Sequence, residues 1–226
     1  MRPIVRPRRL KILLVVVLLA SGTACGSEAA RSPEGVAGEA EPPQAAVSTA
    51  TVPGDTAAAV SEVARPVATA LVQTLGGTLR TQMQERGPVG AMEFCNVQAL
   101  PLTQQVAAEH GMQVKRTSWR LRNPSNAPDE LEVAALRHFE PVRGPGSEAE
   151  PWVQRDPDGG WRYYQPLPTA DACLNCHGSA EELAPGVADA LARLYPEDEA
   201  TGFEEGSLRG LLRVTVPAEA LEDDAN

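Results

Sequence analysis

PWVQRDPDGGWRYYQPL, residues 151–167, carries the clearest strand signal in the chain and determines the fold class. Asp158, Gly159 and Gly160 provide the backbone freedom that a tight turn needs. The second segment, WRYY, is rich in aromatic residues that favour strands. This pattern predicts a β-hairpin, so we expect an antiparallel sheet in the second half of the chain.

Two further extended segments are expected, one before and one after the hairpin. They are MQVKRTSWRLR, residues 112–122, and GSLRGLLRVTVP, residues 206–217. Shorter helices are expected beside them, one beginning at Pro128 and Asp129 and one over residues 183–195.

A long amphipathic helix is expected over residues 58–86. Apolar residues recur there every four positions despite Pro66 and the weak point at Gly76 and Gly77. These residues are Val63, Val67, Leu71, Leu75, Leu79 and Met83. Helices that precede strands of an antiparallel sheet predict the α+β class.

A second helix should follow over residues 87–111, broken or kinked near Pro101. Ala91, Cys95 and Ala99 fall four residues apart on it, so Cys95 can face inward. A buried structural cysteine is the plainer interpretation, because cysteine behaves as a small hydrophobic residue.

Residues 1–24 have the organisation of a secretory signal peptide. A basic start precedes an apolar run from Ile12 to Ala20, and small residues follow. This run is short for a permanent membrane helix, although a retained anchor is the alternative. We therefore expect export to the periplasm or cell envelope.

Cys25 follows Gly-Thr-Ala and precedes Gly26, which is similar to a bacterial lipoprotein box. Gly22 stands where such boxes usually have Leu, and ordinary cleavage nearby is the alternative. Lipidation of Cys25 would attach the chain to a membrane. Residues 25–57 should form a disordered tether, residues 58–217 the folded domain, and residues 218–226 a disordered tail.

The charge balance argues against nucleic-acid binding. The chain has 20 basic and 30 acidic residues, a formal net charge of −10. Removing residues 1–24 takes away five basic residues and no acidic ones, which leaves 15 basic against 30 acidic, or −15. Binding to phosphates needs clustered Lys and Arg, so we expect no nucleic-acid partner.

CLNCH, residues 173–177, is the motif with the most specific chemistry. Two cysteines three residues apart can form a redox dithiol, half of a zinc site or a disulfide. Cys173, Cys176 and an immediately following His177 match the attachment signature of c-type haem. The two thiols would form thioether bonds and the imidazole would bind iron.

A doubly ligated haem needs a second axial ligand besides His177. The candidates in the sequence are Cys95, His110, His138, Met83, Met92 and Met112. The histidines are plausible surface or packing residues, and methionines are commonly core filler. Composition leaves this choice open.

Several spaced motifs together resemble a known family of c-type haem domains with a PAS-like fold, long described as a domain of unknown function. The motifs are EFCN with Pro101 downstream, WRLRNPSNAPDELE, WRYYQPL, CLNCHG and YPEDEATGFEEGSLRGLLRVTVP. The resemblance covers roughly residues 58–217 and implies a PAS-like α+β domain with a long N-terminal helix.

The resemblance also implies roles for individual residues. Cys173 and Cys176 match the thioether cysteines, His177 the proximal ligand, and Cys95 an unusual second axial ligand. Three arginines in the matched segments are candidate partners of the haem propionates, or else solvated strand charges: Arg116, Arg120 and Arg122. Three aromatic residues are candidates for the pocket wall, although large aromatics usually fill cores: Trp119, Tyr163 and Tyr164.

These expectations favour a protein with one covalent haem c and no enzymatic activity. A thiolate ligand stabilises ferric iron, and two axial ligands leave no open position for a substrate. One function is redox or gas sensing in the envelope, with the signal passed to another protein. The alternatives are a tethered electron carrier with a redox partner, and a dithiol or zinc protein that only mimics the motif.

Overall fold

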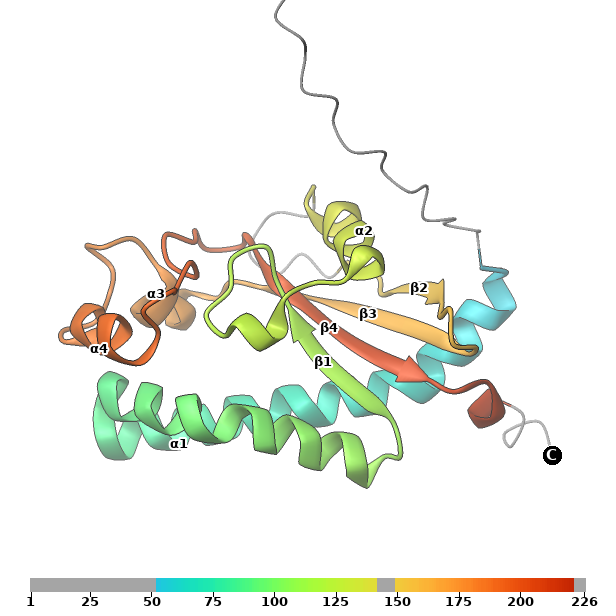
Figure 1. Cartoon of the computed structure of the whole chain (residues 1–226), viewed down its shortest axis with the longest axis horizontal. Helices are drawn as coiled ribbons and strands as arrows, with labels where there is room; N and C mark the ends of the chain where they lie inside the picture. The colour runs from blue at the N-terminus through green and yellow to red at the C-terminus, as the bar shows by residue number, and fades with distance from the viewer. Residues whose placement is uncertain (1–51, 142–148, 222–226) are drawn as a thin grey trace, which may run out of the picture. The chain divides into compact units, whose positions relative to one another are not determined.

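The computed structural model describes residues 52–141 and 149–221. The expected signal peptide over residues 1–24 and Cys25 lie outside the described residues. The domain is α+β, with a four-stranded antiparallel sheet and a long N-terminal helix, α1 (Gly54–Glu109), as a PAS-like fold has. In Figure 1, α1 lies below the sheet and α2 (Glu130–Phe139) lies above it.

Helix α1 consists of two arms that meet at Gly87 and run back along one another (Figure 1). Gly87 has φ 69° and ψ −178°, a conformation that side chains disfavour. The expected break near Pro101 is wrong, because Pro101 lies inside the continuous second arm. The tether boundary is also corrected, since residues 54–57 already belong to α1.

The sheet has the order β1-β4-β3-β2. Its strands are β1 (Gln113–Thr117), β2 (Trp152–Arg155), β3 (Trp161–Pro168) and β4 (Leu208–Val216). The expected hairpin is confirmed by the antiparallel pairing of β2 with β3, in which Trp152 faces Tyr164. The extended segment 112–122 is a strand only as far as Thr117.

The sheet face toward α1 carries the main hydrophobic core. The first arm of α1 packs there against inward-facing residues of β3 and β4, such as Tyr163 and Val214. Val106 from the second arm joins the same cluster, which fixes the two arms together. Four residues of the apolar series expected on α1 pack in this core, whereas Leu79 and Met83 do not: Val63, Val67, Leu71 and Leu75.

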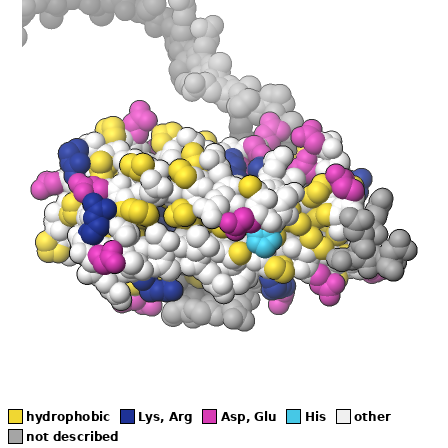
Figure 2. Space-filling view, turned by 90° about the horizontal axis from the view of Figure 1, so that it is seen from below, with side chains coloured by type: hydrophobic (Ala, Val, Ile, Leu, Met, Phe, Trp, Pro, Cys, Tyr) yellow, Lys and Arg dark blue, Asp and Glu magenta, His cyan; other side chains and the backbone are white. Residues whose placement is uncertain are grey.

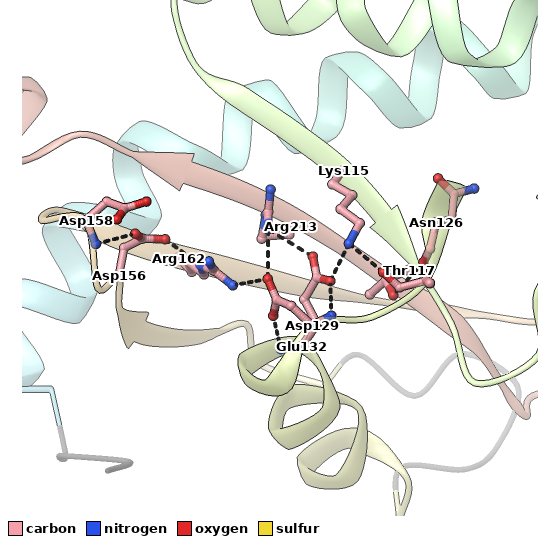
Figure 3. A network of polar contacts seen from close by, with 10 residues as sticks. Lys115, Thr117, Asn126, Asp129, Glu132, Asp156, Asp158, Arg162 and Arg213 are labelled. Atoms are coloured by element: carbon pink, nitrogen blue, oxygen red, sulfur yellow. Dashed lines mark hydrogen bonds and ion pairs between the residues drawn. The ribbon is translucent and has the colours of Figure 1, made fainter. Parts of the chain in front are cut away.

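The opposite sheet face carries α2 and a network of buried charges (Figure 3). Asp129 caps α2, and its carboxylate accepts from the Glu132 N–H while the Glu132 carboxylate accepts from the Asp129 N–H. Glu132 is fully buried and pairs with Lys115 at 2.6 Å and Arg213 at 3.1 Å. Arg162 extends the network by contacting Asp129 at 2.7 Å and Asp156.

Strand β1 alternates between these two faces. Lys115 reaches the charge network under α2, whereas Val114 packs with the core beneath α1. Alternation of this kind follows from the two-residue period of a strand. Arg116 consequently points to the side of α1.

Four short elements complete the domain. They are the 3-10 helix η1 (Pro124–Asn126), α3 (Asp171–His177), α4 (Val187–Leu194) and the 3-10 helix η2 (Ala218–Leu221). The expected disordered tail is therefore wrong for residues 218–221, because Ala220 and Leu221 pack against the main core. Residues 52–141 and 149–221 contain no helix with the length and hydropathy to span a membrane.

Two glycine-to-alanine substitutions should have opposite effects on stability. A Cβ at Gly210 would lie 2.4 Å from the Thr117 carbonyl oxygen, so Gly210→Ala should destabilise the domain by about 1–3 kcal/mol. A Cβ at Gly77, inside α1, would meet nothing within 4 Å, and Gly77→Ala should stabilise by about 0.4–1 kcal/mol. Urea unfolding of both variants tests this, and equal signs would contradict it.

Candidate functional site

Residues from distant parts of the chain line one cavity of about 600 Å³. Both arms of α1 contribute, together with β1, β4, the segment after β1 and helix α3. The three residues of the CLNCH motif and Cys95 all belong to the lining. The volume lies within the range of about 300–1,000 Å³ typical of cofactor and ligand pockets.

His177 is held with one ring nitrogen free. Its Nδ1 lies 2.7 Å from the Ala200 carbonyl oxygen, which can only accept, so Nδ1 carries the hydrogen. The Phe203 ring stands edge-on to the imidazole, with centroids 6.2 Å apart. This arrangement leaves Nε2 as the nitrogen available to a metal, the usual second-shell arrangement of a histidine ligand.

The charge environment of His177 disfavours a proton. Burial, followed by the positive charges of Arg209 and Arg122, lowers the pKa of His177 to about 2. The hydrogen bond to Ala200 opposes this shift. The imidazole is therefore neutral, which is the form that binds a metal.

Cys95, Cys173 and Cys176 are free thiols, each partly buried. Burial raises the pKa of Cys95, while the charges of Arg116 and Arg122 act in the opposite direction. Burial also raises the pKa of Cys176. The second arm of α1 thus presents a third thiol to the cavity that holds the CLNCH motif.

Only some of the candidates for the second axial ligand line the cavity. Met83 and Met92 line it together with Cys95. His138 lies on α2 and stacks on Trp152, with ring centroids 4.4 Å apart. His110 follows the end of α1, and Met112 packs against the main core. Among the described residues, Cys95 and the two cavity methionines remain.

Arg122 holds the CLNCH motif in place. Its guanidinium bonds Asp198 at 2.9 and 3.2 Å, and donates to the carbonyls of Cys176 at 2.7 Å and Ala200 at 3.1 Å. Ala200 is the residue that also accepts from His177. Arg122 therefore positions the end of α3 and the acceptor of the histidine.

A model of the Tll0287-like family (Tll0287) matches residues 43–217 of the chain. The chain belongs to the Tll0287-like family. The solved crystal structure of the cyanobacterial heme-protein Tll0287 is similar to it, with a TM-score of 0.52 and 28% sequence identity. The match covers 70% of this chain and 94% of that one. No curated protein matches the chain.

The aromatic candidates do not form the pocket wall of this Tll0287-like domain. Tyr163 and Tyr164 are fully buried in the two cores on opposite sheet faces. Trp119 is 41% exposed and does not belong to the cavity lining. The core-filling interpretation is confirmed for the two tyrosines.

Arg209 and Phe203 are site residues of the Tll0287-like domain that the sequence analysis missed. Arg209 lines the cavity from the start of β4, and the Arg209 and Arg120 guanidiniums lie 5.0 and 4.6 Å from the centre of the Phe203 ring. Both residues lie inside the motif YPEDEATGFEEGSLRGLLRVTVP, but no spacing rule connects them to His177. Their role depends on the loop that brings residues 199–203 to α3.

The zinc interpretation gains no support from the described part of the chain. No group of three or more His, Cys, Asp and Glu residues there is arranged to hold a metal ion. A structural zinc site usually needs four such ligands.

Proposed function

We propose that this chain binds one haem c, attached through Cys173 and Cys176, with His177 and Cys95 as axial ligands. The convergence of these four side chains on one cavity carries the proposal. The similarity to a protein described as a heme-protein supports it. When bound, the haem supplies a one-electron redox centre.

The cavity residues fit such a group. Apolar residues of both α1 arms form much of the wall, and the donor set includes a neutral imidazole and thiols. The Nε atom of Arg116 is buried without a hydrogen-bond partner, which suits a ligand that carries carboxylates. Each motif thiol would add across one vinyl group, which forms a C–S bond without a leaving group.

The axial residues predict the electronic character of the site. A thiolate from Cys95 would stabilise ferric iron and lower the reduction potential relative to a methionine ligand. If His177 and Cys95 both bind the iron, no coordination position would be left for a substrate. We therefore propose a binding and redox role and no enzymatic activity.

Sensing in the cell envelope is the function we favour. Cys95 lies on the second arm of α1, beyond the Gly87 junction, whereas His177 lies on α3. Loss of the Cys95 bond would release this arm from the haem, and the change could pass to a signalling protein. Export, a lipid on Cys25 and a position at the membrane remain part of this proposal.

Electron transfer to a redox partner is the second candidate. Leu79 and Leu100 line the cavity yet are 42% and 41% exposed, so the cavity edge reaches the surface. Figure 2, viewed from the side of α1, shows apolar side chains between charged ones on this face. An exposed haem edge is what a carrier requires.

Spectra of the matured protein test the ligand assignment. The oxidised protein should show a low-spin ferric thiolate signature in optical and EPR spectra, and Cys95→Ala should lose it. Met92→Leu is the matched control, because Met92 lines the same cavity one turn earlier on α1. A signature that survives Cys95→Ala would show that the Cys95 assignment is wrong.

The reduced protein distinguishes the two roles. A sensor should change its axial ligation on reduction or bind added CO, because the signal requires a broken Cys95 bond. A carrier should keep both ligands and exclude CO. Retention of both ligands would make electron transfer the better function.

A further inference from the structure

The cavity is strongly cationic although the chain is acidic. Five arginines line it, and none of its described lining residues is Asp or Glu: Arg80, Arg116, Arg120, Arg122 and Arg209. The chain as a whole carries a formal charge of −10. Such a local reversal of charge indicates a ligand with negative charge.

Two of these arginines already have partners in the protein. Arg122 is paired with Asp198 and binds two carbonyls. Arg120 donates to the carbonyls of Glu199 at 3.0 Å and Gly202 at 3.2 Å. Their donors are largely engaged. Arg80 is exposed and needs no partner to offset desolvation.

Arg116 and Arg209 are different, because both are partly buried and neither pairs with a carboxylate among residues 52–141 and 149–221. The buried Nε of Arg116 has no hydrogen-bond partner. Arg209 donates to the Ser118 hydroxyl at 3.3 Å, which is a neutral acceptor. Burying a charge without a counter-charge is costly unless a ligand supplies one.

The pKa values of both guanidiniums reflect this burial. Burial lowers the pKa of Arg116, and the nearby Cys95 and Tyr195 oppose the shift. Burial and then the charge of Arg122 lower the pKa of Arg209 to about 10. Both side chains still carry their positive charge near neutral pH.

The two arginines lie on adjacent strands. Arg116 belongs to β1 and Arg209 to β4, and these strands pair in antiparallel register. Both side chains line the cavity, which therefore offers two planar donor forks, each suited to one carboxylate.

We propose that Arg116 and Arg209 bind the two propionate carboxylates of the haem. The inference rests on the proposed function and replaces Arg120 and Arg122 as propionate partners. It also assigns Arg209, which no motif in the sequence singles out.

Resonance Raman spectra of the haem-loaded protein test this directly, because the propionate bending bands report hydrogen bonds to these carboxylates. Arg116→Gln and Arg209→Gln should each shift a propionate band. The reduction potential should also fall by about 59 mV for one electron, which corresponds to a tenfold decrease in the equilibrium constant for reduction. The unneutralised carboxylate causes this, since it stabilises ferric iron.

Arg120→Gln is the matched control, because it removes the same charge from the same cavity. It should leave the propionate bands at the positions of the unaltered protein. Bands that do not move in Arg116→Gln and Arg209→Gln, or that move equally in Arg120→Gln, would overturn the proposal. If a glutamine variant does not accumulate, the lysine variant at that position replaces it in the test. A single ammonium group cannot reproduce the two parallel hydrogen bonds of a guanidinium, so the lysine variant must also shift the propionate band.

Failure of the proposed function would look different. A protein that holds no haem after coexpression with c-type maturation machinery contradicts the haem proposal itself. A protein with covalent haem and unmoved propionate bands contradicts the arginine assignment alone.

Discussion

Replacing both Cys173 and Cys176 with serine should leave haem that acidified organic solvent extracts completely, whereas the haem of the unaltered chain should stay with the polypeptide. Serine hydroxyls do not form the thioether bonds that hold a c-type haem. Both cysteines lie on α3 and line the cavity as free thiols, so nothing in the described structure competes for them. The measurement is the absorbance of the pyridine haemochrome before and after extraction.

Cys95→Ser is the control for this experiment. It removes a thiol from the same cavity but should leave the haem covalently attached, because Cys95 lies outside the CLNCH motif. Haem that resists extraction from the Cys173→Ser, Cys176→Ser variant would mean that the attachment residues have been assigned wrongly.

Glu132→Ala should lower the free energy of unfolding by about 3–5 kcal/mol. Glu132 is fully buried, and its carboxylate pairs with Lys115 and Arg213 and accepts the Asp129 N–H. Removal leaves two cations under α2 without their main counter-charge and takes away half of the capping box (Figure 3). Urea unfolding followed by circular dichroism measures the loss.

Glu130→Ala on the same helix is the matched control, because Glu130 is exposed at the first turn of α2. It should change stability by less than about 0.5 kcal/mol. A loss of similar size in the two variants would show that the buried network contributes little and that the effect comes from removing negative charge at the N-terminus of α2.

Local signals were sufficient to predict most of the fold. The turn at Gly159 and Gly160 determines the hairpin, and Asp129 begins α2 because its carboxylate caps the helix. The sequence could not predict that the helix continues through Pro101. A helix that packs on a sheet can tolerate the one hydrogen bond that the proline removes. The true reversal at Gly87 requires a positive φ, which glycine alone adopts readily.

The site was predictable only where a motif or a resemblance marked it. Spacing predicts the CLNCH residues and the family resemblance predicts Cys95; all of them line the cavity, and their ligand roles stay predictions. The Ala200 carbonyl reaches His177 only through a loop whose path depends on tertiary contacts such as Phe203 N–H to His177 O at 2.9 Å. Arg209 lines the cavity from β4, and no local motif connects it to CLNCH. Arginine type alone cannot distinguish Arg122, which supports the backbone, from Arg116.

The alternation along β1 has a consequence for how the sequence can change. Lys115 serves the charge network on one face, and Arg116 serves the cavity on the other. A one-residue slip of β1 against β4 would move each of these two side chains to the opposite sheet face. The charge network would lose Lys115 and the cavity would lose Arg116. The side chains on both faces of β1 therefore constrain its alignment with β4. Insertions or deletions should be tolerated far less within residues 113–117 than in surface loops.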